Sequence, residues 1–294
     1  GVLSLVGRPT LYLLVALASA AVLGWRSRQG WFGVASATLG TVLLLALGMP
    51  LVLFVTRQQP SLVLEQAASP AVHRMLYLTV YGPLLAALVA LGFGVPLAYL
   101  LTRGFWGQTV VESLVDLPLV VPHSVAGILV LFGFGRRGLF PDVPLLTTTT
   151  GMVLALTFVS APFAVNAARE AFEGIDPRLE YAARSHGAGP AGTFLRVMLP
   201  LASRGIVTGG VLAWARGVSE FGAVAVVAYS VYFFYPFAGT NPTLSQHAPV
   251  YIFNVYTSSG LEEAGAVAFI LLAMSLAVFL LVRRLAYDRR GGIV

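Results

Sequence analysis

Four charged residues of this chain are candidates for chemistry. They form two pairs, each with one positive and one negative side chain close together in the sequence. Arg216 and Glu220 stand four positions apart in a strongly apolar stretch, and Glu180 and Arg184 repeat that spacing in a polar stretch. Side chains four residues apart lie on the same face of a helix, so both pairs are expected to meet. An ionised group within an apolar span is costly and is by default a candidate functional group. Arg216 could therefore contact an anionic substrate; the alternative is an ion pair with Glu220 that locks the helices together.

The composition excludes several kinds of catalytic site. All 18 basic residues are arginine, and the chain contains neither lysine nor cysteine. A Walker A lysine, a Schiff-base lysine, a cysteine nucleophile and a thiolate metal site are therefore impossible. The four histidines are scattered and give no convergent catalytic set. We expect no enzyme activity, metal or cofactor in this chain, and no nucleic-acid partner, because the arginines are spread along the whole sequence.

The same composition indicates an all-α polytopic membrane protein. Of the 294 residues, 57% are hydrophobic and only 10% are charged, whereas a soluble domain carries about a quarter charged residues. A spanning helix needs about 20 mostly apolar residues. Seven stretches meet this condition, at roughly 9–25, 31–56, 75–101, 113–135, 151–168, 206–229 and 263–282. The expected position of Arg216, ten residues into the sixth stretch, is near the middle of the bilayer.

The arginines predict how these spans are oriented. With a cytoplasmic C-terminus, 12 arginines fall in inside segments and five in outside segments, as the positive-inside rule requires. Residues 169–205 are then cytoplasmic, and residues 230–262 are external. The first stretch is expected to be an extra helix with its N-terminus outside, and a signal-like segment is the alternative. The aromatic-rich outer segment 230–262 would either receive a binding protein or only anchor the chain at the membrane interface.

The polar stretch 169–205 is predicted to form two short helices joined by a sharp turn. Asp176 followed by Pro177 is a strong helix start, an N-cap with proline at the first helical position. Gly187 suits the end of that helix, where a left-handed conformation is common. A second helix is expected over about 190–198, leading into the sixth span.

These residues carry a resemblance to a known family. Their order resembles the EAA motif of type I ABC importer permeases, in which this loop docks on the ATPase subunit and transmits its closure to the membrane helices. The resemblance implies a coupling role for Glu180, Ala182, Ala183, Arg184, Gly187, Phe194, Leu199 and Pro200.

The same resemblance implies a domain organisation and partners. Residues 71–282 would form the permease domain, 31–70 its first core helix with an external loop, 1–30 an extra helix with a short cytoplasmic turn, and 283–294 a cytoplasmic tail. Such permeases work as pairs with two ATPase subunits, which bind the ATP, and with an extracytoplasmic binding protein. We expect a homodimer in the cell membrane.

Two further stretches narrow the substrate. Residues 116–127 (DLPLVVPHSVAG) and 214–229 (WARGVSEFGAVAVVAY) resemble segments of oxyanion permeases and are closest to molybdate/tungstate permeases of archaeal type. Sulfate permeases share the Glu-Phe-Gly core of the second stretch, so a sulfate or thiosulfate permease is the alternative. An ion-coupled secondary transporter is a more distant alternative, but it would predict inverted repeats. No internal repeat is visible, and that alternative leaves the 169–205 loop unexplained.

The translocation path is expected along the fourth and sixth spans. Pro118 and Pro122 each remove a backbone hydrogen bond and should kink or break the fourth span. Irregular backbone at membrane depth is tolerated only where it faces protein or a water-filled cavity. The polar candidates for the path are His123, Ser124, Arg216, Ser219 and Glu220. A buried histidine that is simply hydrogen-bonded to a neighbour is the alternative for His123.

Overall fold

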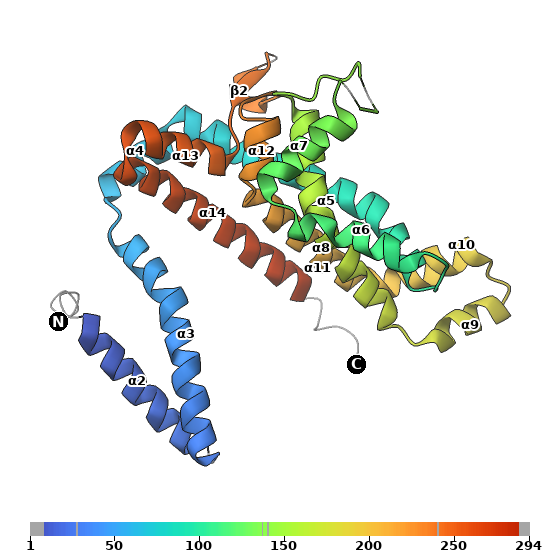
Figure 1. Cartoon of the computed structure of the whole chain (residues 1–294), viewed down its shortest axis with the longest axis horizontal. Helices are drawn as coiled ribbons and strands as arrows, with labels where there is room; N and C mark the ends of the chain where they lie inside the picture. Colours follow the sequence, from blue (N-terminus) through green and yellow to red (C-terminus); the bar gives the residue numbers. More distant parts are fainter. Residues whose placement is uncertain (1–8, 28, 137, 140, 240, 288–294) are drawn as a thin grey trace. The chain divides into compact units, whose positions relative to one another are not determined.

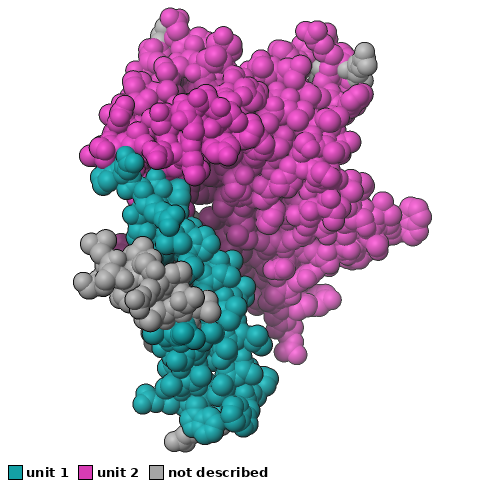
Figure 2. Space-filling model, turned by 60° about the vertical axis from the view of Figure 1, so that its left-hand side comes forward, with its two compact units in different colours: residues 1–60 teal, residues 61–294 magenta. Residues whose placement is uncertain are grey.

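The structure, a computed structural model, describes residues 9–27, 29–136, 138–139, 141–239 and 241–287. It divides into two compact units, residues 1–60 and 61–294 (Figure 2). Five of the arginines used to predict orientation lie outside the described residues: Arg8, Arg28, Arg137, Arg289 and Arg290.

The first unit is a helical hairpin. Helix α2 (Pro9–Arg26) and helix α3 (Gly30–Thr56) pack against each other beside their short connection. A Cβ atom on Gly24 would lie 2.5 Å from the carbonyl oxygen of Gly33, so only glycine allows this approach. Helix α3 is long and apolar enough to cross a membrane, whereas the apolar part of α2 is shorter.

The second unit starts at Ser61, within α4 (Pro60–Ala68), and is built mainly from helices (Figure 1). The long ones are α5 (Pro70–Leu101), α8 (Thr149–Glu173), α11 (Leu199–Val218) and α14 (Leu261–Tyr287). The shorter ones are α6 (Gln108–Val120), α7 (His123–Phe134), α9 (Pro177–Ser185), α10 (Pro190–Thr193), α12 (Gly222–Val227) and α13 (Ala248–Ser259). Among the described residues of the whole chain, five helices are long and apolar enough to span a membrane, and two shorter apolar helices accompany them.

The core of this unit lies where α5, α8 and α11 pack together. Its buried side chains are mostly small or branched, among them Leu78, Ala86, Ala90, Met152, Leu156, Ala164, Ala168 and Ala213. Lipid tails are as apolar as these side chains, so helices in a bilayer are held mainly by close packing. Two glycines of α11 allow such packing against α8: a Cβ atom on Gly205 would lie 2.4 Å from Ala171 Cβ, and one on Gly209 would lie 2.9 Å from Ala167 Cβ.

Two predicted spans are interrupted in the structure. The fourth, expected over 113–135, breaks between α6 and α7 at Val121 and Pro122, as the proline chemistry predicted, while Pro118 remains inside α6. The sixth, expected as one helix over 206–229, was placed wrongly, because α11 starts at Leu199 and ends at Val218 before α12 begins.

Segment 230–262 is more ordered than a loop. Strands β1 (Val231–Phe233) and β2 (Thr243–Ser245) pair antiparallel, with a 3₁₀ turn (η2, Pro236–Ala238) between them and α13 after them. The last helix, α14, continues to Tyr287, past the apolar part that could cross a membrane, which ends at Leu281.

The glycine crossing of α8 and α11 gives a first prediction. Gly209→Val would place a Cβ atom 2.9 Å from Ala167 Cβ and 3.1 Å from the Ala164 carbonyl oxygen, and such overpacking costs about 1–3 kcal/mol. We expect the melting temperature of the detergent-purified protein to fall. Gly92→Val in α5 is the matched control, because no atom lies within 4 Å of its Cβ position. Equal melting temperatures for the two variants would contradict this account of the crossing.

Candidate functional site

The first helix of the 169–205 loop forms as its sequence predicted. The Asp176 side chain accepts a hydrogen bond from the backbone N–H of Arg178 at 2.9 Å, and Pro177 is the first residue of α9. Gly187 follows the helix with φ of +86°, a conformation that side chains other than glycine rarely adopt. The loop therefore turns sharply at the predicted residue.

The second arm of the loop is continuous with the following membrane helix. Helix α10 passes into a π-helical turn (η1, Phe194–Met198), which leads directly into α11 at Leu199. The backbone N–H of Leu199 reaches back five residues to the carbonyl of Phe194. Pro200 has no N–H to donate, and a wider turn before it relieves the clash that its ring makes in a regular α-helix. The second arm is thus continuous with a helix of the core.

Glu180 has a different environment from the one expected. Its predicted partner Arg184 donates to Oε1 at 2.6 Å, but Arg103 also donates to Oε2 at 2.5 Å. Only 8% of the Glu180 side chain is exposed, although its helix lies in a polar stretch of the sequence. We call Tyr99, Arg103, Glu180 and Arg184 the anchor cluster.

The outer face of the loop is free in this chain. Tyr181 is 67% exposed, and the side chains of Leu179 and Leu195 are also largely exposed. Ala182, on the same helix, is exposed and adds no bulk. Large apolar side chains on a polar, exposed loop are typical of a surface that binds another protein.

A second group of polar residues gathers where the two spans are broken. Arg216 lies in the last turn of α11, where its Nη2 atom forms an ion pair with Glu220 Oε2 at 2.7 Å. The same nitrogen donates to His123 Nε2 at 2.8 Å. The His123 Nδ1 atom lies 3.3 Å from the same Glu220 oxygen. We call these three side chains the junction cluster. It joins the end of α11, the start of α12 and the start of α7.

The junction cluster brings a guanidinium and a carboxylate together beside an imidazole ring. A guanidinium can only donate, so the His123 nitrogen 2.8 Å from Arg216 is the acceptor. Glu220 is fully buried, whereas His123 is 50% exposed. The structural alternative for His123 was a buried histidine that is hydrogen-bonded to a neighbour; the hydrogen bond to Arg216 is present, but the side chain is half exposed.

The junction explains the unexpected helix break. Glu220 Oε1 accepts a hydrogen bond from the backbone N–H of Ala223 at 2.8 Å, which satisfies a donor at the start of α12. The Ser219 hydroxyl donates to the carbonyl of Arg216 at 3.0 Å. Both side chains therefore compete with the backbone hydrogen bonds of a regular α-helix. As a result Arg216 lies in the last turn of α11, whereas the sequence predicted one helix that continues to residue 229.

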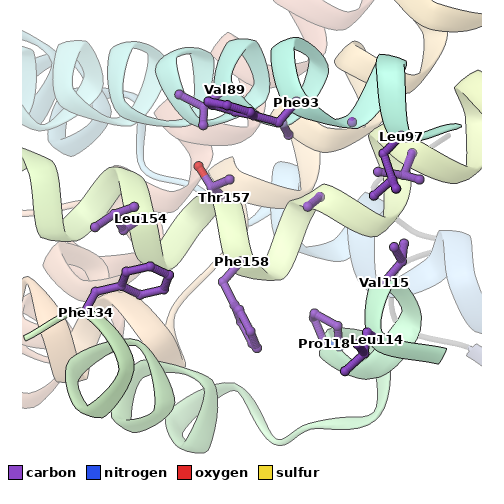
Figure 3. Close-up of a pocket in the computed structure, with 14 residues that line it drawn as sticks. Val89, Phe93, Leu97, Leu114, Val115, Pro118, Phe134, Leu154, Thr157 and Phe158 are labelled. Carbon is purple, nitrogen blue, oxygen red and sulfur yellow. The ribbon is translucent and has the colours of Figure 1, made fainter. Parts of the chain in front are cut away.

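The predicted path residues do not all meet. Pro122 and Ser124 are exposed beside His123 at the start of α7. Pro118 is buried in α6 and instead lines an apolar cavity of about 320 Å³ between α5, α6, α7 and α8 (Figure 3). Thr157 is the only lining side chain with a polar group. The cavity therefore offers nothing that would recognise an anion.

Sequence reasoning missed Tyr99 and Arg103 in the anchor cluster, and also His247. Arg103 lies two residues after the end of α5. The arginine distribution had placed it on the same side of the membrane as the loop, but nothing local linked it to Glu180. His247 is fully buried at the start of α13, and burial lowers its pKa to about 4, while the nearby Glu220 main chain acts in the opposite direction. Among the described residues, no three His, Asp or Glu side chains converge to hold a metal ion.

Both the sequence and the fold of this chain match known proteins. Residues 90–290 match the family described as binding-protein-dependent transport system inner membrane component. A molybdate/tungstate transport system permease protein of Pyrococcus abyssi is 35% identical over 250 residues, which cover 84% of this chain and 92% of that protein. A probable molybdenum ABC transporter permease protein of Haloferax volcanii is 40% identical over 260 residues, covering 87% and 91%.

The fold is also found in a solved structure. A bacterial alginate ABC transporter in complex with its alginate-bound periplasmic protein contains a chain that matches with a TM-score of 0.70, covering 92% of this chain and 99% of that one. At 15% identity this likeness concerns the fold alone.

The junction cluster gives a second prediction. Glu220→Gln keeps an oxygen for the Ala223 N–H but leaves Arg216 without its counter-charge, and breaking a buried pair from one side costs about 3–5 kcal/mol. We expect a clear fall in the melting temperature of the purified protein. Glu262→Gln at the exposed start of α14 is the control and should melt like the wild type. A melting temperature for Glu220→Gln equal to that of the control would show that the pair is not structural.

Proposed function

This chain belongs to the family of inner membrane components of binding-protein-dependent transport systems, and we propose that it is the permease subunit through which an ATP-driven importer moves molybdate or tungstate into the cell. The observation that carries the proposal is the 169–205 loop. Its two arms are built into the core helices, and its outer face is unoccupied in this chain. Such an element can receive a force from outside the membrane domain and pass it inward.

The partner on that face is, in our proposal, an ATPase subunit. The exposed Tyr181, Leu179 and Leu195 supply apolar contact area, and Arg184, whose side chain is half exposed, supplies a cation. ATP would be bound and hydrolysed by this partner, and this chain would need no cofactor. We further propose that two copies of this chain pair with two ATPase subunits, with the loop and the C-terminus in the cytoplasm. An oxyanion-binding protein would deliver substrate to the opposite face.

The junction cluster fits a place that an oxyanion passes rather than one where it is stored. His123 is half exposed and Arg216 lies behind it, so positive charge and hydrogen-bond donors are within reach of an anion. Glu220 neutralises Arg216 and keeps the cluster from holding a dianion tightly. A pathway must bind weakly enough to release its substrate, and the binding protein can provide the affinity.

The choice of oxyanion gives a third prediction. In proteoliposomes with the ATPase subunits and the binding protein, tungstate or molybdate at submicromolar external concentration should accelerate ATP hydrolysis and accumulate inside. Sulfate at the same concentration should do neither. Stimulation by sulfate alone would instead assign the chain to the sulfate permeases, and stimulation by none of the three would contradict an oxyanion importer.

Orientation gives a fourth prediction, which uses the absence of native cysteine. Ser185→Cys lies on the exposed end of α9 and should react with a membrane-impermeant thiol reagent only after the cells are opened. Ser258→Cys, on exposed α13, is the matched control and should react in intact cells. Labelling of Ser185→Cys from outside would reverse the proposed topology.

A further inference from the structure

The end of α5 holds the loop by a contact outside the sequence motif. Arg103 donates to Glu180 Oε2 at 2.5 Å, although 77 positions separate the two residues. The Arg103 guanidinium also lies over the Tyr99 ring, 4.0 Å from its centre. Because Arg184 occupies the other oxygen of Glu180, the carboxylate is fixed from two directions. The anchor cluster therefore links α9 to the end of α5, in addition to the Glu180–Arg184 pair within α9.

The same end of α5 also contacts the second arm of the loop. The Tyr99 ring lies 4.8 Å from that of Phe194 in η1 and 5.4 Å from that of Phe172 near the end of α8. These aromatic rings form part of a buried cluster with Leu101 and Met198. Both arms are thus held by the last turn of α5, a helix to which the loop has no short covalent connection.

The outer half of α5 reaches the neighbourhood of the junction cluster. Trp214 donates its indole N–H to the carbonyl of Val80 at 3.2 Å. Gly217, next to Arg216, packs so closely on α5 that a Cβ atom there would lie 2.9 Å from Pro83 Cβ. From Val80 to Tyr99 the helix is about 28 Å long. One helix therefore touches the loop at one end and the residues flanking Arg216 at the other.

We propose that Arg103 is a positioning residue for energy coupling, which makes α9 and the end of α5 move as one body. The inference rests on the proposed function. A displacement of the loop by the ATPase subunit is then delivered to α5, and through α5 to Trp214 and Gly217 beside the junction cluster. This route adds to the covalent connections of the loop through α8 and α11. Arg103 itself touches neither substrate nor nucleotide.

The test measures the amount of oxyanion transported for each ATP hydrolysed. The complete complex is reconstituted with wild-type chain, Arg103→Ala, Arg103→Lys or Arg74→Ala. We expect the Arg103→Ala complex to retain its ATPase subunits and to hydrolyse ATP. The amount of oxyanion transported per ATP should fall about tenfold, a common size for coupling between two sites. Arg103→Lys keeps a charge opposite Glu180 and should recover most of the ratio. Arg74→Ala, at the other end of α5, should match the wild type.

A covalent link provides the second measurement. The pair Arg103→Cys and Glu180→Cys, in a chain without other cysteines, can be joined by a bifunctional thiol reagent of suitable length. Without the reagent, the double-cysteine complex should transport little oxyanion per ATP. The covalent link should restore this amount, because it replaces the ion pair. This measurement tests the inference even if the Arg103→Ala complex assembles poorly.

Two outcomes would overturn the inference: a wild-type ratio in Arg103→Ala, or a linked pair that stays uncoupled. These outcomes are distinct from a failure of the proposed function, in which the wild-type complex itself would transport no oxyanion.

Discussion

The packing of α11 against α8 through glycine is the constraint on which the rest of the second unit depends. Helices in lipid gain little from burying apolar side chains against one another, so their association requires atoms in close contact over a long surface. Gly205 and Gly209 provide that contact with Ala171 and Ala167. Because the two helices are held side by side, the two arms of the 169–205 loop start from fixed positions. A mobile connection would not transmit force.

The second constraint is the need to satisfy backbone groups where helices break within the membrane domain. The two breaks pack on each other: a Cβ atom on Gly222 would lie 2.8 Å from His123 Cβ, and one on Gly127 would lie 2.8 Å from the carbonyl oxygen of Ala223. Glu220 serves both breaks, since one oxygen caps α12 and the other pairs with Arg216 and lies 3.3 Å from His123 at the start of α7. A single buried carboxylate thus makes an irregular backbone tolerable where an anion would pass.

Features that depend on neighbouring residues could be predicted from the sequence, and those that depend on distant ones could not. The cap at Asp176, the turn at Gly187 and the pairs at four-residue spacing follow from local geometry and are present. The contact of Arg103 with Glu180 and the burial of His247 require knowledge of which helices are neighbours. The end of α11 was missed for another reason: the hydrophobic pattern continues past Glu220, whereas the side chain of Glu220 begins a new helix.

The π-helical turn at Phe194–Met198 changes the direction in which the preceding side chains point around the helix axis. Such a turn contains one residue more than the regular helix needs, and one residue corresponds to about 100° of rotation. The loop arm before the turn is therefore rotated relative to α11 by that amount. A regular helical wheel drawn from Pro190 to Val218 would therefore assign loop residues to the wrong face of the helix. It would place Leu195 on the same face as Ala202, seven positions later. In the structure Leu195 is exposed and Ala202 is buried.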